Sequence, residues 1–464
     1  MNSTVRRHAG FRRSFAIAAA AALALPVAAC SSSHSNTPTN TAGQKVTISV
    51  DCAPPTSNQV QYEDWNADVA TFEKANPNIT IDSVRTYPCE TPALFTAALK
   101  AGTEANVFYT YFTDLPQVLE DGQAADITSY VNSSTVPNFK YMAPTAVNAV
   151  KAGGSLYGLP YSVYTMGLIY NKNLFTQAGL DPNSPPTTWA QVEADAKKIS
   201  ALGNGVIGYG DYSAGHNGGW HFVSEMDALG DHVLNTDNTA ANFNNSDAQQ
   251  LLGILHQMRY VDNDMGATQD LAWGSLQKEM ASNKLGMYIA APDDITYMVQ
   301  QLGANLDDFD MGPIPSISGT AAGSLLGGND YMFAKRDTPA QIEAGVKFVN
   351  FMQLTEGVGQ FNYQRLQQQK QIVGLPEPVL FAAGTPPYNQ DNQLKEKYAT
   401  VPISQYSNFV TANVPGWPES IIAQPIYAVL DNVMSGVLTN PNANDAALLS
   451  TAANQVNTLI SNSQ

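Results

Sequence analysis

The chain has 464 residues, of which 44% are hydrophobic and 14% are charged, and its formal net charge is −17. This apolar share can build a sizeable core, which excludes a wholly disordered chain, and the length suggests about two or three domain-sized units. The acidity argues against binding to nucleic acid or to an anionic membrane surface, because both need clustered Lys and Arg. Three cysteines are too few for a disulfide scaffold and show no zinc-ligand spacing.

The N-terminus has the pattern of a secretory signal peptide over residues 1–29. Residues 1–14 are basic, and residues 15–29 form a small, apolar run that is too short for a membrane span of about 20 residues. The segment from Arg12 to Phe15 matches part of a twin-arginine export motif, so the Sec and twin-arginine routes both stay open. Without the four arginines of this segment, 19 basic residues face 40 acidic ones, and the remaining body carries a formal charge of −21.

Cys30 is a candidate site of lipidation. The preceding residues LPVAA resemble the lipobox of bacterial lipoproteins, in which the cysteine is lipidated and becomes the mature N-terminus. The alternative is an ordinary signal peptide with a chance cysteine. Residues 30–45 then form a tether rich in Ser, Asn and Thr, with a reach of roughly 20 Å by random-coil scaling. We therefore expect a lipid anchor at Cys30 to hold a soluble body on the outer face of the cell membrane.

Strands and helices alternate from Lys45 onward, as β-branched runs give way to apolar residues at helical spacing. The predicted order is strand 46–50, helix 62–76, strand 79–84, helix 92–102 and strand 106–112. This alternation predicts a parallel α/β sheet. Ligands of such sheets bind beyond the carboxyl ends of the strands, which places Asp51, Tyr87 and residues 109–114 near a candidate site.

Two further cysteines, Cys52 and Cys89, each follow a predicted strand. If these strands are parallel neighbours, both cysteines leave the same edge of the sheet, and a disulfide between them is geometrically reasonable in an oxidising compartment. The alternative is two free thiols. A disulfide here would contribute a few kcal/mol to stability and would stiffen a binding edge.

A resemblance to a known family appears in the segment from Leu159 to Asp181, LPYSVYTMGLIYNKNLFTQAGLD. It resembles a pattern of the carbohydrate-binding group of bacterial extracellular solute-binding proteins, often called family 1, which serve ABC importers. The matching residues are Tyr170, Asn171, Lys172, Phe175, Ala178, Gly179 and Leu180, and a Pro-x-Thr-Trp follows from Pro186. FEKANPNITI, ALKAGTEANVF, KEMASNKLGMYIAAPDD and GPIPSISG resemble further family segments in the expected order, although Asn106 stands where an Asp is usual.

The resemblance covers almost all of residues 46–464 and implies an α/β, two-lobed periplasmic-binding-protein-like fold. Each lobe would be a mostly parallel sheet flanked by helices, with a hinge of crossing strands near Tyr161–Thr165 and Gly323–Gly328. The first lobe would contain 46–162 and 328–405, and the second would contain 166–322 and 406–464. The family implies a monomer without a cofactor that captures a small solute, a mono- or oligosaccharide, and passes it to ABC permease subunits. Closure about the hinge would then be a population shift driven by the solute.

Aromatic side chains in the expected cleft are candidates to stack on a sugar ring, whose C–H face is apolar. Trp220 lies among glycines, and the family often places a stacking aromatic in this part of the second lobe; the alternative is packing on its own lobe. Trp417 lies in a turn bounded by Pro and Gly, and Tyr164 lies in the first crossing strand. For each of these two residues the sequence allows either contact with the ligand or structural packing. Trp65 and Trp189 are expected in the core, and Trp273 is expected to pack.

Polar candidates lie at the ends of the third strand and of the return crossing. Tyr109 and Thr110 end the predicted third strand, and Asn329 and Asp330 follow paired glycines where the backbone comes close to a ligand. Asp114 is expected to be a solvated loop charge.

Asp293 stands where many family members have a Trp. If the alignment holds, an anion replaces a stacking ring and could accept from two sugar hydroxyls or pair with a cationic ligand. A slip of one residue would make Asp293 a helix N-cap instead. Ligand contact and capping are both open.

The sequence carries no convincing catalytic or metal pattern. His216 and His221 lie five residues apart without a cluster of Cys or carboxylates, so no metal site is expected. Adjacent carboxylates such as Asp293 and Asp294 do not face one another, so no acid–base pair is expected. The main hypothesis is therefore a binding protein for a carbohydrate. The alternatives are a binding protein for a polyamine or amino-sugar derivative, and a secreted glycosidase.

Overall fold

The computed structural model describes residues 45–85, 92–376, 380–420 and 422–463. The predicted signal peptide, Cys30 and most of the tether lie outside the described residues, as do Tyr87 and Cys89. Cys52 is disulfide-bonded, while its predicted pairing with Cys89 stays a prediction because Cys89 is not described. No helix of the described part is both long and apolar enough to cross a membrane.

The first sheet has six strands. The predicted strands β1 and β2 pair in parallel, and β3 pairs in parallel on the other side of β1, which confirms the parallel arrangement expected from the sequence. β11 lies antiparallel to β3 and also pairs with β6 and β12. The strands of this sheet are β1 (Val46–Val50), β2 (Ile79–Ser83), β3 (Val107–Tyr111), β6 (Gly158–Thr165), β11 (Ser324–Phe333) and β12 (Gly416–Pro418). A separate small hairpin joins β4 (Lys151–Ala152) to β5 (Ser155–Leu156).

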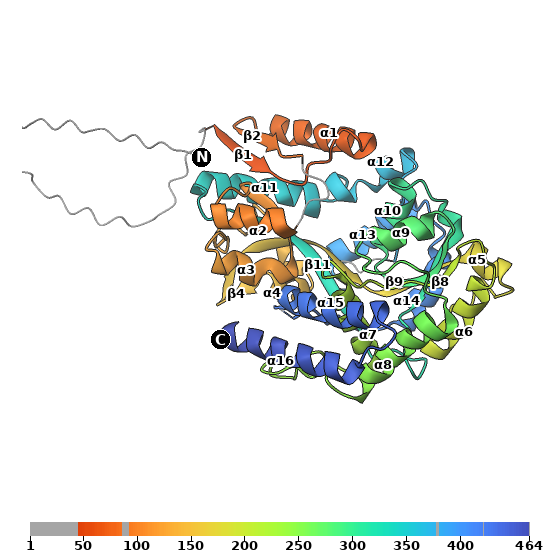
Figure 1. The fold of residues 1–464 in the computed structure, drawn as a ribbon. Helices are drawn as coiled ribbons and strands as arrows, with labels where there is room; N and C mark the ends of the chain where they lie inside the picture. The colour runs from red at the N-terminus through yellow and green to blue at the C-terminus, as the bar shows by residue number, and fades with distance from the viewer. Residues whose placement is uncertain (1–44, 86–91, 377–379, 421, 464) are drawn as a thin grey trace, which may run out of the picture. The chain divides into compact units, whose positions relative to one another are not determined.

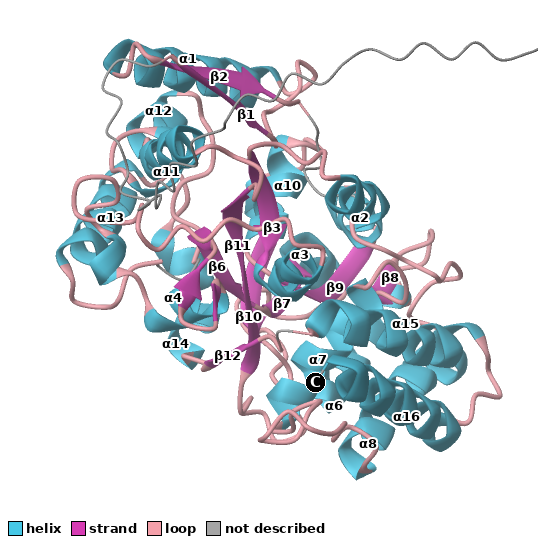
Figure 2. Ribbon diagram, turned by 90° about the vertical axis from the view of Figure 1, so that its left-hand side faces the viewer, coloured by secondary structure: helices cyan, strands magenta, loops and turns pink. Residues whose placement is uncertain are grey.

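Helices that pack around this sheet form the part that we call the first lobe. Figure 1 shows α1 and α11 beside β1 and β2, and Figure 2 shows α12 and α13 on the same side of β11 and β6. These helices are α1 (Gln59–Ala75), α2 (Pro92–Ala101), α3 (Leu115–Glu120), α4 (Pro144–Ala149), α11 (Pro339–Leu354), α12 (Tyr363–Gln368) and α13 (Pro386–Tyr398).

The second sheet has the order β10-β7-β9-β8, with β7 (Gly167–Asn171), β8 (Ile207–Tyr209), β9 (Leu285–Ala290) and β10 (Phe309–Pro313). Only β8 and β9 pair in parallel, so the expectation of a mostly parallel sheet is wrong here. The reason lies in the connections. β7 follows β6 with one residue between them, whereas β10 runs back toward β11, and Gly167 therefore pairs with Pro313. A strand that leaves the crossing and one that returns to it must run in opposite directions.

The helices that pack with this sheet form the second lobe. Figure 2 shows α7, α8, α15 and α16 gathered in one bundle. The helices of this lobe are α5 (Lys172–Gln177), α6 (Trp189–Ser200), α7 (Asn217–Leu229), α8 (Ser246–His256), α9 (Ser275–Ala281), α10 (Asp293–Gln300), α14 (Ser407–Ala412), α15 (Ala423–Thr439) and α16 (Asp445–Ser463).

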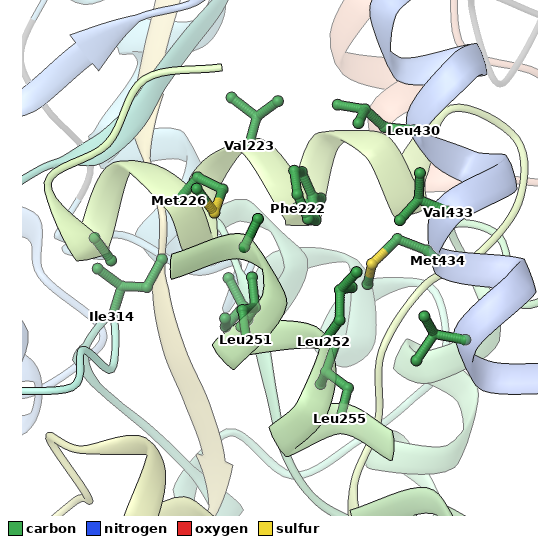
Figure 3. Close-up of a cluster of buried hydrophobic side chains, with 14 of the residues drawn as sticks. Phe222, Val223, Met226, Leu251, Leu252, Leu255, Ile314, Leu430, Val433 and Met434 are labelled. Carbon is green, nitrogen blue, oxygen red and sulfur yellow. The ribbon is translucent and has the colours of Figure 1, made fainter. Parts of the chain in front are cut away.

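A buried apolar cluster fixes α7 in this bundle, and α7 carries Trp220 near its start. Three helices supply most of the cluster residues labelled in Figure 3, because α7, α8 and α15 each present an apolar stripe at helical spacing. Figure 3 labels ten buried residues of this cluster: Phe222, Val223, Met226, Leu251, Leu252, Leu255, Ile314, Leu430, Val433 and Met434. Trp189 and Trp65 lie in the cores of the second and first lobes, which confirms their predicted packing.

The expected lobe boundaries stay a prediction, and one segment near the end of the first lobe packs across them. Leu375 and Val401, which we expected in the first lobe, pack in a cluster with Met311 and Tyr288 of the second sheet. The segment between α12 and α14 therefore packs on elements of both lobes. The boundary near residue 405 stays a prediction.

Gly219 is required where α7 meets α15. A Cβ atom at Gly219 would lie 2.3 Å from the carbonyl oxygen of Tyr427 and 2.4 Å from its Cα, and backbone atoms cannot move aside as a flexible side chain can. We expect Gly219→Ala to lower the free energy of unfolding by about 1–3 kcal/mol through overpacking. Urea denaturation would measure the change.

Gly253 in α8 is the matched control, because a Cβ atom there meets nothing within 4 Å. Gly253→Ala is expected to stabilise the protein by about 0.5–1 kcal/mol through helix propensity. Equal effects of the two substitutions would contradict the close approach of α7 to α15.

Candidate functional site

A row of tyrosine rings lines one face of the first sheet. Tyr109 and Tyr111 lie two residues apart on β3 and so share a face, with ring centroids 5.6 Å apart. The ring of Tyr161, from β6, lies 6.2 Å from that of Tyr109 and 5.3 Å from that of Tyr331. The amide of Asn329 donates to the hydroxyl of Tyr109, and the hydroxyl of Ser162 donates to Asn329 Oδ1 at 2.8 Å. Tyr109 and Asn329 are thus joined as parts of one surface.

Trp220 meets this row from the second lobe. It lies in the first turn of α7, after His216 in the left-handed conformation. Its ring stands edge-on to that of Tyr164, with centroids 6.1 Å apart. Tyr164 belongs to β6, the strand that crosses between the lobes, so the predicted residues Tyr164 and Trp220 meet where the two lobes join.

Glu419, which the sequence did not single out, lies beside Tyr164. A Cβ atom at Gly327 would lie 2.3 Å from the hydroxyl oxygen of Tyr164 and 2.8 Å from Glu419 Oε2. Both side chains therefore pack against Gly327, where a larger residue would clash with them. The hydroxyl of Tyr427 donates to Glu419 Oε1 at 2.6 Å. Burial raises the pKa of Glu419 to about 7, and the negative charge of Asp114 acts in the same direction.

Asp293 faces the same region from α10. Its side chain is exposed to solvent, yet surrounding protein atoms raise its pKa to about 7, and the charge of Asp294 adds to this rise. Burial raises the pKa values of Tyr161 and Tyr164, and the negative charge of Asp293 adds to both rises. The helix begins at Asp293 itself and Pro292 occupies the N-cap position, so the N-cap alternative is wrong.

Asp294 has a different role from its neighbour. It is buried and accepts hydrogen bonds from Tyr288 at 2.9 Å and from Gln277 at 2.8 Å. The indole of Trp273 also donates to it, at 3.1 Å. The ring of Trp273 lies 4.5 Å from that of Tyr297, yet Trp273 is 42% exposed. The predicted packing is therefore only partial, because one face of the ring contacts Tyr297 while much of the side chain contacts solvent.

Thr110 and Asp330 lie beneath the tyrosine row and are fully buried. They are cross-strand partners on β3 and β11, and the hydroxyl of Thr110 donates to Asp330 Oδ1 at 2.9 Å. Asp114 is also buried and accepts from the backbone N–H of Tyr111 at 2.8 Å, so the expectation of a solvated loop charge is wrong. These three residues hold the end of β3 in place.

Trp417 lies at the side of the crossing strands. Its ring packs against that of His232, with centroids 4.1 Å apart, and against Gly323. The structure therefore brings Tyr109, Tyr164, Trp220, Asp293 and Asn329 around one space, and it places Trp417 against a neighbour in its own region.

A hydrogen-bonded chain joins the two lobes next to this space. Gln424 of α15 donates to the hydroxyl of Thr113 at 2.9 Å, and its amide oxygen lies 2.9 Å from His216 Nδ1. Thr113 belongs to a short 3-10 helix, η1 (Phe112–Asp114), directly after β3. His221 Nδ1 instead contacts Asp211 at 2.7 Å inside the second lobe. Among the described residues no group of three metal-ligating side chains occurs.

A cavity of about 170 Å³ continues the space toward α12 and α13. Tyr161 lines it, as does Thr296, which lies three residues after Asp293 and so shares that face of α10. Gln360 and Tyr363 line it from the first lobe. Residues of both lobes therefore contribute to one continuous surface.

The sequence analysis did not single out Tyr161 or Glu419 of this surface, and it included Tyr111 only within the range 109–114. The signal for Tyr111 was present, because alternate residues of a strand share a face and Tyr109 was already a candidate. Tyr161 lies in the same crossing as Tyr164. Glu419 follows Trp417 by two residues, but its approach to Tyr164 depends on the pairing of β12 with β11.

The arrangement combines aromatic faces with carboxylate and amide groups. Aromatic faces contact the C–H face of a ring-shaped, hydroxylated molecule, and carboxylates and amides bind its hydroxyls. The paired carboxylates of a glycosidase would both have to reach one bond. Here Asp293 and Asp294 have separate surroundings, so this pair cannot fill that role.

Comparison with known proteins identifies the family of this chain. A model of the bacterial extracellular solute-binding protein family matches residues 56–359. A binding protein of Brucella abortus is 28% identical over 228 residues, which are 48% of this chain and 52% of that protein, so the match spans about half the length of this relative.

Two solved structures show the fold. An ABC transporter solute-binding protein from Thermotoga lettingae, bound with alpha-D-tagatose, has a TM-score of 0.69 at 19% identity and covers 90% of this chain and 100% of its own. UgpB from Mycobacterium tuberculosis in complex with glycerophosphocholine has a TM-score of 0.69 at 15% identity, over 90% of this chain and 99% of its own. The chain has the α/β periplasmic-binding-protein fold.

The buried acids of this region predict that stability falls as pH rises. Burial raises the pKa of Asp227 to about 8, and the charge of Glu419 contributes. In the unfolded chain this pKa is about 4, so the folded state binds the proton more tightly. The stabilisation is complete below pH 4 and is lost as the pH rises toward 8. We expect the Tm to be higher at pH 5.5 than at pH 8, by roughly 1 °C for each kcal/mol lost, because the entropy of unfolding grows with chain length.

Asp227→Asn is expected to reduce this difference, because an amide does not titrate. His232, whose Nδ1 lies 3.4 Å from Asp227, is the nearby titratable base and is retained in the variant. Asp237→Asn, at an exposed position of the same lobe, should leave the pH profile unchanged. Calorimetry of the three proteins measures this, and an unchanged slope for Asp227→Asn would contradict the assignment.

Proposed function

Because the chain belongs to the bacterial extracellular solute-binding proteins, we propose that it captures a carbohydrate, a mono- or oligosaccharide, and delivers it to an ABC importer. Members of this family are binding proteins and components of ABC transporters, so the glycosidase alternative falls away. The partners of the proposed function are the permease subunits of the importer, which are separate chains.

The observation that carries the proposal is the aromatic surface that both lobes share. Tyr109 and Tyr161 supply rings from the first sheet, and Trp220 supplies one from α7. Asn329 and Asp293 add an amide and a carboxylate at its edge. Stacking rings next to hydrogen-bonding groups suit a sugar better than a wholly apolar or a strongly charged ligand.

The crossing strands give the proposal a mechanism. A solute that contacts Trp220 on one lobe and Tyr109 on the other binds best when both are brought together, so it favours the closed state. The hydrogen bond between Gln424 and Thr113 joins the lobes beside the solute. The closed, loaded form would be the one that the permease recognises.

A bound sugar is expected to raise the Tm by mass action and to reduce the radius of gyration. Thermal-shift screening over neutral sugars would find the ligand, and small-angle X-ray scattering would measure closure. Trp220→Ala should then weaken binding by about tenfold, since an aromatic stacking partner is worth roughly 0.5–1.5 kcal/mol beyond its buried area.

Trp220→Phe is the matched control and should keep most of the affinity, because a ring remains in place. Trp417→Ala should have the smaller effect of the two alanine variants, since that ring packs on His232. Undiminished affinity in Trp220→Ala would remove the proposed stacking contact.

We also propose that Cys30 anchors the protein by lipid to the outer face of the membrane. The support is the sequence before Cys30 and an exported family of relatives. In the native host, Cys30→Ser should move the protein from the membrane fraction to the soluble fraction and abolish labelling with radioactive palmitate. Cys52→Ser should keep both label and membrane attachment. Equal labelling of the Cys30→Ser variant would contradict the anchor.

A further inference from the structure

We propose that the cavity beside Tyr161 is a subsite for the terminal unit of an oligosaccharide, so that the solute is a neutral sugar of two or more units. This narrowing rests on the carbohydrate-binding function proposed above. The terminal unit places its hydroxyls on the ion pair of Asp391 and Lys395, and the rest of the solute lies on the aromatic surface that both lobes share.

The cavity adjoins the aromatic surface at β6. Tyr161 lines the cavity, and its ring lies 6.2 Å from that of Tyr109 in the tyrosine row. Ser162 also lines it, and its hydroxyl donates at 2.8 Å to Oδ1 of Asn329, which belongs to the aromatic surface. Thr296 of α10 lines the cavity from the second lobe. A solute that covers Tyr109 and Tyr161 can therefore extend into the cavity without leaving the protein.

The volume of the cavity fits one end of a solute rather than the whole. It measures about 170 Å³, whereas a pocket that encloses a complete drug-sized ligand measures about 300–1,000 Å³. A single sugar unit that binds on the aromatic surface leaves this space to water. A second unit fills it and gains contacts that a monosaccharide lacks. Affinity should therefore rise with the length of the sugar.

An ion pair forms the polar part of the cavity wall. Asp391 and Lys395 lie one turn apart on α13, and Lys395 Nζ lies 3.2 Å from Asp391 Oδ2. The hydroxyl of Tyr363, which also lines the cavity, donates to Asp391 Oδ1 at 2.6 Å. The acid and the base balance each other's charge. A solute with a charge of its own would upset this balance, whereas neutral hydroxyls leave it intact.

Both members of this pair keep hydrogen-bonding capacity for a solute. Asp391 is 2% exposed, and within the described part of the chain its Oδ2 accepts no regular hydrogen bond, because Lys395 Nζ approaches it at an unfavourable angle. A buried oxygen without a donor costs free energy, and a donor from the solute removes this cost. The ammonium group of Lys395 carries three donors. Because a hydroxyl both donates and accepts, neighbouring hydroxyls of one sugar ring can bind Asp391 and Lys395 together.

Apolar side chains form much of the remaining wall. Phe361 and Leu366 line the cavity together with Tyr363, and all three belong to the apolar packing of the first lobe. The C–H face of a sugar ring packs on such side chains while its hydroxyls bind polar groups. A cavity that combines apolar contacts with a balanced ion pair therefore suits a neutral, hydroxylated ring.

Calorimetric titration with sugars of increasing length is the first test. Three series serve as probes: glucose, maltose and maltotriose; glucose, cellobiose and cellotriose; and xylose, xylobiose and xylotriose. In at least one series we expect the disaccharide or the trisaccharide to bind ten times or more as tightly as the monosaccharide. The added affinity comes from hydrogen bonds to the ion pair and from apolar burial in the cavity.

Lys395→Met and Thr296→Phe test whether this gain arises in the cavity. Lys395→Met removes the donors and keeps a long side chain, and Thr296→Phe fills part of the cavity with a ring. Each should lower the affinity for the longer sugar by tenfold or more and change that for the monosaccharide by less than threefold, because a single unit lies on the aromatic surface. A purely structural ion pair would instead lower the Tm and affect both sugars alike.

Lys347→Met and Thr176→Phe are the matched controls, because neither residue lines the cavity. Lys347 pairs with Glu343 at 2.6 Å, also one turn apart on a helix of the first lobe, and Thr176 is exposed on α5 of the second lobe. Both variants should keep the affinities for the long and the short sugar. If Lys395→Met does not fold, Thr296→Phe still decides, because it leaves the ion pair in place.

The outcomes separate the subsite from the function on which it rests. If the monosaccharide binds as tightly as the longer members of its series, or if Thr296→Phe keeps the full gain, the subsite is wrong and the carbohydrate-binding function stands. If no sugar of the three series binds, both proposals fail.

Discussion

The antiparallel pairing of β6 with β11 is the constraint on which the rest of the structure depends. The chain passes from the first sheet to the second after β6 and returns at β11, so these paired strands belong to both lobes. Their register sets Gly327 opposite Tyr164, and only a residue without a Cβ atom leaves room there for Tyr164 and Glu419. A slip of one residue would turn Tyr164 to the other face and dismantle the site.

Alternation along β11 places its two polar residues on opposite faces. The register with β6 also shifts between Asn329 and Asp330, where Pro160 of β6 has no N–H to donate. Asn329 reaches Tyr109 and Ser162 on the aromatic surface, whereas Asp330 reaches Thr110 in the interior. Asn329 and Asp330 are thus adjacent in the sequence, but one contacts the aromatic surface and the other is buried in the interior.

The sequence was a good guide to the first sheet, and a poorer guide to which side chains share a face or meet across the lobes. The strands β1 to β3 and their parallel order followed from hydrophobic periodicity. Tyr109 and Thr110 were both chosen because they end a strand, although alternation allows only one of them to face a given side. Trp417 was chosen for its ring, whereas Glu419 reaches Tyr164 only through the pairing of β12 with β11. Such contacts between distant segments leave no local trace in the sequence.

The acidity of the body has a local counterpart at the join between the lobes. Asp51 follows β1 and Asp114 lies three residues after β3, and the negative charge of Asp114 acts on Glu419 beside Tyr164. Burial removes water from around Asp114 and Glu419, which strengthens the repulsion between them. The negative charge that argues against nucleic acid and anionic membranes as partners is therefore also present in the buried region where the two lobes join, and a solute that binds there must tolerate it.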